Sequence, residues 1–154
     1  MQVFLVRHAE AVAETVAVRD SYRNLSVLGR KQARSLGDRM RWHDCSPSLI
    51  WTSPLVRAVQ TAELVAGGMS CEIAIEAVPA LSPDGSPRDV VAAITKLADD
   101  AAVFLVGHEP SLSAIGALLV GDRSFGVIAK AEAVRILDGK VRWRFAWDAE
   151  EPKR

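Results

Sequence analysis

Two of the three histidines of this chain lie in short, polar segments at the ends of predicted strands. Arg7-His8-Ala9-Glu10 lies near the start of the chain, and Gly107-His108-Glu109-Pro110 lies in its last third. A third segment, Ser53-Pro54-Leu55-Val56-Arg57, carries another arginine. The planar guanidinium group of arginine binds two phosphate oxygens at once and stays charged at any working pH. Two imidazoles and two guanidiniums around one crevice would therefore suit a phosphoryl group.

An imidazole in such a crevice could do more than bind. It can attack phosphorus and hold it as a phosphohistidine, which splits one displacement into two easier ones. Most of the remaining catalytic work would be positioning and charge stabilisation of the transferring group. Helices that start at Ser53 and Pro110 would add their positive N-terminal ends.

Each of the three segments directly follows an apolar run that is typical of a strand. These runs are Val3–Val6, Leu49–Trp51 and Ala101–Val106. A short, continuous apolar run indicates a strand covered on both faces. After the second run, Ser53 suits a helix N-cap and Pro54 the first helical position, so a helix is predicted from there to Gly67-Gly68.

Helical patterns alternate with these strands. Ser26 can cap a helix that runs to about Met40. Further predicted elements are a strand at Cys71–Ile75, a loop at Pro79–Pro87, a helix at Asp89–Leu97 and a helix from Pro110 to about Leu119.

The C-terminal part has a different pattern. Asp138-Gly139 separates the strand-like runs Ala133–Leu137 and Lys140–Trp147. An Asp-Gly pair between two such runs predicts a tight hairpin, so the last strands are expected to be antiparallel.

This order of elements predicts an α/β fold, a three-layer α/β/α sandwich in a single domain over residues 1–154. Strands that alternate with helices imply a mostly parallel central sheet with helices on both faces. Ligands of such sheets bind beyond the carboxyl ends of the strands. The three polar segments are therefore expected to meet at one edge of the sheet.

The same three segments resemble the signatures of a known family. Arg7-His8-Ala9-Glu10, the run from Ser53 to Thr61 and Gly107-His108-Glu109 are similar to the motifs of the histidine phosphatase superfamily, which has a phosphoglycerate mutase-like fold. The short chain and the segment Leu81–Gly85 resemble its SixA-type phosphohistidine phosphatases. The resemblance extends from Met1 to about Trp147.

This resemblance implies a role for each site residue. His8 would be the nucleophile, Arg7 and Arg57 would bind the phosphate, and His108 would donate to its oxygens. Glu109 is a candidate proton donor, although an acid in the first turn of a helix is also favoured by the helix dipole alone. Glu10 and Asp84 are weaker candidates for the same role.

The expected activity is metal-independent phosphatase chemistry through a phosphohistidine intermediate, with no cofactor and with phosphohistidine on a protein as the leading substrate. One alternative is a phosphatase of a small phosphate ester, and another is a phosphate-binding module without catalysis. A two-histidine, one-carboxylate metal site is a further alternative. It would place both arginines beside the cation, which is electrostatically costly.

Composition excludes several other classes of function. Nineteen basic residues balance nineteen acidic ones, so no broad positive field favours nucleic acid or an anionic membrane. The isolated Cys45 and Cys71 and the absence of a signal-peptide pattern indicate a cytoplasmic protein. The stretch from Ile75 to Asp89 is too short for a large lid, so an open site is expected.

Overall fold

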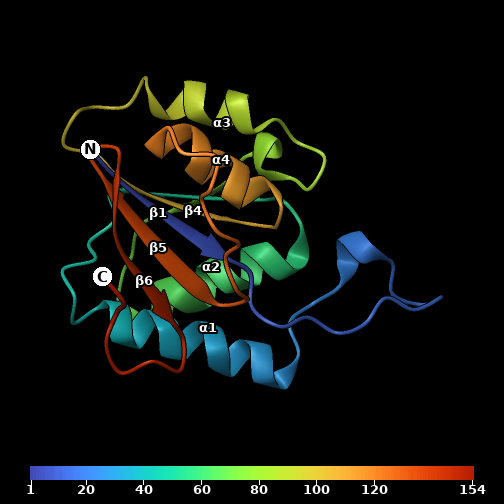
Figure 1. Ribbon diagram of the computed structural model, residues 1–154. Helices are drawn as coiled ribbons and strands as arrows, with labels where there is room; N and C mark the ends of the chain where they lie inside the picture. The colour runs from blue at the N-terminus through green and yellow to red at the C-terminus, as the bar shows by residue number, and fades with distance from the viewer.

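A six-stranded sheet forms the centre of the computed structural model, which describes all residues from Met1 to Arg154 (Figure 1). The strand order is β3-β2-β4-β1-β5-β6. The first four of these are parallel, whereas β5 runs antiparallel to β1, and β6 to β5. The strands are β1 (Gln2–Arg7), β2 (Leu49–Thr52), β3 (Ile75–Ala77), β4 (Ala102–Gly107), β5 (Glu132–Leu137) and β6 (Lys140–Ala146).

Helices cover both faces of this sheet. Figure 1 shows α1 and α2 on one side of the strands and α3 and α4 on the other. Successive residues of β1 supply both interfaces, because strand side chains alternate between faces. Phe4 and Val6 belong to the apolar cluster under α1 and α2, and Val3 and Leu5 belong to the cluster under α3 and α4. The helices are α1 (Val27–Met40), α2 (Val56–Gly68), α3 (Pro87–Ile94) and α4 (Ser111–Val120).

The predicted three-layer α/β/α sandwich with antiparallel C-terminal strands is confirmed. The predicted hairpin is also present, with Asp138 at φ 51° and Gly139 at φ 69°. Two consecutive positive φ angles are those of a type I′ turn, which matches the twist of the strands that it joins.

The chain after β1 is held by the start of α1. Ser26 is the N-cap of α1, and its hydroxyl accepts a hydrogen bond from the Gly29 amide at 3.0 Å. Gly29 lies so close to the Glu10 carbonyl that a side chain at this position would collide with it. Absence of a side chain at Gly29 therefore lets α1 pack against the segment that follows His8.

Three predicted boundaries are wrong. α2 begins at Val56 with Leu55 as its N-cap, so Ser53 and Pro54 precede the helix. The third strand lies at Ile75–Ala77, where its residues pair with β2, rather than at Cys71–Ile75. α3 spans Pro87–Ile94 instead of Asp89–Leu97.

The cause of the last error is local. The Ser86 hydroxyl accepts from the Asp89 amide and caps α3, and Pro87 fits the first helical turn because its missing N–H has no partner there. The predicted loop before it contains a short 3-10 helix at Pro79–Leu81. No helix of the molecule is both long and apolar enough to cross a bilayer.

Candidate active site

The three polar segments meet at the carboxyl edge of the sheet. Arg7 pairs with Gly107 at the ends of β1 and β4, and the His8 amide donates to the Gly107 carbonyl at 3.0 Å. The Ser53 amide donates to the Val106 carbonyl at 2.9 Å. This register places the two imidazole rings side by side, with 5.2 Å between the centroids of His8 and His108.

The ring of His8 is held by the backbone. Its Nδ1 lies 2.7 Å from the carbonyl oxygen of Ala9. A carbonyl can only accept, so Nδ1 carries the proton and the neutral ring keeps its lone pair on Nε2. The Ala9 amide donates to Thr61 Oγ1 at 3.0 Å, and this hydroxyl donates to the Arg57 carbonyl at 2.7 Å. Thr61 thus connects the turn after His8 to α2.

The ring of His108 is held by Ser53. His108 Nε2 lies 2.7 Å from Ser53 Oγ, and this oxygen accepts from the Leu55 amide at 3.2 Å. The Ser53 hydroxyl can donate its hydrogen to Nε2, and in that tautomer the proton of the neutral His108 ring is on Nδ1. Nδ1 is buried and has no hydrogen-bond partner within the protein.

Both arginines are held by hydrogen bonds that leave part of the guanidinium group without a protein partner. Arg57 is buried, and its Nη1 donates to the Asp20 carbonyl at 2.8 Å, while Nη2 lies 3.4 Å from Asp20 Oδ2. Arg7 Nη1 donates to the Ile128 carbonyl at 2.9 Å. Nε of each arginine is buried without a protein partner. The two guanidiniums and, in the tautomer in which Ser53 donates to Nε2, the His108 Nδ1–H are donors of the kind that an oxyanion accepts.

Glu109 lies at the margin of this group. Its Oε2 accepts from the Ser113 hydroxyl at 2.6 Å, and Oε1 accepts from the Ile128 amide at 3.4 Å. The Ile128 carbonyl accepts from Arg7, so Glu109 and Arg7 both contact the backbone of Ile128. Of the weaker candidates, Glu10 accepts from the Ser26 hydroxyl at 2.8 Å, and Asp84 is exposed. No three His, Cys, Asp or Glu side chains cluster closely enough to hold a metal ion.

Burial and positive neighbours keep both imidazoles neutral. Burial lowers the pKa of His8 to about 4, and the charges of Arg57, Arg7 and Lys130 add to this effect, while its hydrogen bond to Ala9 opposes it. Burial likewise lowers the pKa of His108 to about 3, with further contributions from His8 and Arg57. At neutral pH both rings are therefore uncharged, and His8 has an unprotonated nitrogen.

These pKa shifts predict a pH-dependent stability. The unfolded histidines take up a proton near pH 6.5, whereas the folded His8 takes it up only near pH 4. Between these values the unfolded chain binds more protons, so the free energy of unfolding falls as the pH falls. The shift of His8 from 6.5 to about 4 corresponds to a loss of about 3 kcal/mol. We expect the free energy of unfolding, measured with urea between pH 4 and 7, to change less with pH in the His8→Gln/His108→Gln variant than in the wild-type protein. An equal change in both proteins would contradict the assignment of these pKa shifts.

The side chains of both histidines have little exposed surface. His8 is 7% exposed and His108 is 3% exposed, and neither lines any of the four surface hollows of the molecule. The cause is partly the segment between β1 and α1, whose short 3-10 helix (Asp20–Tyr22) brings Asp20 onto Arg57. Beside it lies a hollow of about 640 Å³ that includes Arg19 and Asp20.

Sequence reasoning missed several residues of the site. Asp20 lies in a segment without a pattern that would indicate a function. Ser53 was predicted as a helix cap, although its place at the end of β2 could have suggested a side chain that faces His108. Thr61 stands one turn after Arg57 in α2, and this spacing was the available signal for its contact with the Arg57 carbonyl.

The class of protein follows from this fold and these strand-end residues. The family model of the histidine phosphatase superfamily (branch 1) matches residues 3–82. The chain belongs to this superfamily, and it is a phosphatase.

Individual relatives agree with this placement. The chain is 29% identical over 150 residues to the phosphohistidine phosphatase SixA of Escherichia coli (strain K12), covering 96% of this chain and 92% of that protein. It is 33% identical over 133 residues to the SixA homolog of Haemophilus influenzae, covering 80% of each. A solved structure of the protein histidine phosphatase SixA complexed with tungstate superimposes with a TM-score of 0.88 at 25% identity, covering 96% of this chain and 97% of that one.

Proposed function

We propose that this protein, as a single histidine phosphatase-like domain, removes phosphate from phosphohistidine on another protein through a covalent intermediate on His8. The observation that carries this proposal is the hydrogen bond from His8 Nδ1 to the Ala9 carbonyl at 2.7 Å. It leaves Nε2 as the free nitrogen of a neutral ring, which is the form that can attack phosphorus. Two arginines and a second imidazole surround this ring.

The reaction has two displacements. In the first, His8 Nε2 forms a bond to phosphorus while the phosphorus–nitrogen bond of the substrate breaks, and the substrate imidazole leaves as a neutral ring that keeps the proton already on its other nitrogen. In the second, water attacks phosphorus and the bond to Nε2 breaks, which releases inorganic phosphate and restores neutral His8. Both steps pass through an in-line arrangement in which charge is spread over the equatorial oxygens of the phosphoryl group.

The remaining residues stabilise this charge. Arg7 and Arg57 would hold the phosphoryl oxygens, and the His108 Nδ1–H would donate a further hydrogen bond. Ser53 and Thr61 are positioning residues, since they act on the substrate through His108 and through the turn after His8. The Asp20 carboxylate forms an ion pair with Arg57 Nη2. A phosphoryl oxygen that binds Nη2 would therefore compete with this carboxylate.

Several observations support a phosphoprotein substrate. Both SixA relatives are named as phosphohistidine phosphatases, and one solved SixA structure contains tungstate, a tetrahedral oxyanion like phosphate. An imidazole leaves more easily than an alkoxide because it is far less basic. This matters here because Glu109, the leading candidate for the proton donor, is held by Ser113 and Ile128. Two free cysteines are consistent with the reducing cytoplasm, where we propose that the reaction takes place.

The proposal is tested by substrate preference. The purified protein is assayed against a phosphohistidine-containing protein and a panel of sugar and nucleotide phosphates, with a chelator present throughout. We expect kcat/KM to be highest for phosphohistidine and unchanged by the chelator. A higher kcat/KM for a small ester would indicate that the protein is a phosphatase of small phosphate esters instead. Absence of turnover on every substrate would indicate a phosphate-binding module without catalysis.

The Glu109→Gln variant tests the leaving-group argument. We expect kcat/KM for alkyl phosphate esters to fall about 100-fold or more, which is typical of the loss of a general acid. Hydrolysis of phosphohistidine should fall less than about fivefold, since its leaving group needs less help from an acid. Measuring kcat/KM for both substrates in both proteins gives the two barrier changes. Equal losses on both substrates would refute the argument.

A further inference from the structure

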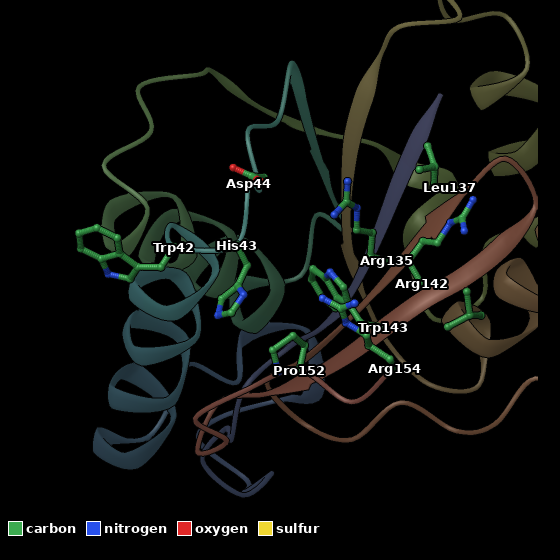
Figure 2. A pocket seen from close by; sticks show the side chains of 10 residues that line it. Trp42, His43, Asp44, Arg135, Leu137, Arg142, Trp143, Pro152 and Arg154 are labelled. Atoms are coloured by element: carbon green, nitrogen blue, oxygen red, sulfur yellow. The ribbon is translucent and has the colours of Figure 1, made fainter.

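The largest hollow of the surface lies away from the active site, between the turn that follows α1 and the β5–β6 hairpin (Figure 2). It has a volume of about 730 Å³. Two of its residues, Arg135 and Leu137, pair with Phe4 and Gln2 in the amino-terminal half of β1. His8 follows the opposite end of that strand, so this hollow and the active site are separate.

Three arginines line this hollow: Arg135, Arg142 and Arg154. Figure 2 shows Arg154 next to Trp143, the side chains of Arg135 and Arg142 extending in different directions, and Trp42 farther out on the side of the turn after α1. The one acidic residue in the lining is Asp44. None of these four charged side chains takes part in any of the ion pairs of the molecule. In a chain with no net charge, this is a local excess of uncompensated positive charge.

Arg135 is held ready to bind an anion. It is half-buried, its Nε donates to Gln2 Oε1 at 3.0 Å, and its guanidinium carbon lies 5.8 Å from the centre of the Phe4 ring. The two terminal NH₂ groups make no hydrogen bond to the protein. A guanidinium fixed at Nε loses little conformational freedom when these groups bind a phosphate or carboxylate.

A β-bulge brings Arg142 to the same hollow. Arg135 pairs with Trp143 and the next residue, Ile136, pairs with Val141, so Arg142 has no partner in β5. An extra residue of this kind changes the direction of a side chain, and bulges are frequent beside functional sites. Arg142 is exposed and makes no hydrogen bond or ion pair that would explain the bulge by stability alone.

The rest of the lining would suit an organic group. Leu137, Val141 and Pro152 supply apolar surface, and the buried Trp143 also contributes to the lining. A volume of about 730 Å³ exceeds what a single phosphate needs, and it falls within the range of roughly 300–1,000 Å³ that is common for small-molecule sites. Three guanidiniums are fully used only by a ligand with at least two anionic groups.

We propose that this hollow is a second ligand site, which binds a small organic molecule with two or more phosphate groups, such as a nucleoside diphosphate. The assignment does not depend on the catalytic role of His8. Arg135 and Arg142 bind the phosphate groups, Arg154 adds a third positive group at the rim, and the apolar residues contact the organic part.

The test uses ADP as the probe and nuclear magnetic resonance of the nitrogen-15-labelled protein at physiological salt. We expect saturable shifts of the amide signals of residues 42–44 and 135–143. Adenosine, which lacks the phosphates, should cause no such shifts, and pyrophosphate should bind more weakly than ADP. Shifts confined to the surroundings of His8 would overturn the proposal. Equal affinities for ADP and pyrophosphate would contradict the claim that the apolar residues contact the organic part of the ligand.

Two variants separate a defined site from general attraction. Arg142→Gln should weaken ADP binding at this hollow at least about tenfold, because it removes charge-assisted hydrogen bonds. The matched control is Arg88→Gln, at an exposed arginine of α3, which should leave the affinity unchanged. Neither side chain supports the fold through an ion pair. Equal weakening in both variants would show an effect of net charge and would overturn the proposal.

Discussion

Replacement of His8 by alanine is expected to lower kcat at least about 10⁴-fold on phosphohistidine, because it removes the only group placed to attack phosphorus. The residual donors, Arg7, Arg57 and His108, would still bind the substrate, so KM should change far less than kcat. Turnover is measured in the presence of a chelator for the wild-type and His8→Ala proteins.

Two controls separate lost chemistry from lost structure. The thermal transition of His8→Ala should remain cooperative, because the ring of His8 is anchored to one carbonyl and its loss leaves the sheet hydrogen bonds in place. A His8→Gly variant should regain part of its activity when free imidazole is added. A folded His8→Ala protein that keeps more than about a tenth of the activity would refute the nucleophile assignment.

Arg57→Lys is expected to lower kcat/KM by about 10² to 10³, although it keeps the positive charge. Arg57 is 5% exposed, and its guanidinium is oriented by the Asp20 carbonyl at 2.8 Å. A lysine ammonium has neither the planar fork nor the same reach, so it would lose the geometry that the equatorial oxygens need in the transition state.

The matched control for this variant is Arg88→Lys on α3, which should retain wild-type kcat/KM. Because Arg57 acts on the transition state more than on bound substrate, most of the loss should appear in kcat. A loss confined to KM would indicate that Arg57 only contributes to ground-state binding.

The strands and the strand-end residues could be predicted from sequence because their signals are local and strong. The apolar runs before Arg7, Ser53 and Gly107 are continuous, and parallel strands bring their carboxyl ends to one edge. The Asp138-Gly139 turn was equally clear, since few residue pairs adopt two positive φ angles.

Other features depend on contacts between distant segments. The contact between Asp20 and Arg57 joins residues that lie 37 positions apart and carry no shared motif. The role of Ser53 was hidden because a serine before a proline is also a good helix cap, and only the position of His108 decides between the two. The bulge at Arg142 depends on the register between β5 and β6, which residue patterns do not fix.

The most direct test of the central claim is to trap the phosphoenzyme. The protein is mixed briefly with a phosphohistidine-containing protein, quenched in base, in which a phosphoramidate is stable, and digested for peptide mass spectrometry. We expect phosphate on His8 in the N-terminal peptide, and the signal should disappear after acid treatment. Phosphate on Ser53, or an unmodified His8 under conditions of rapid turnover, would contradict the covalent mechanism.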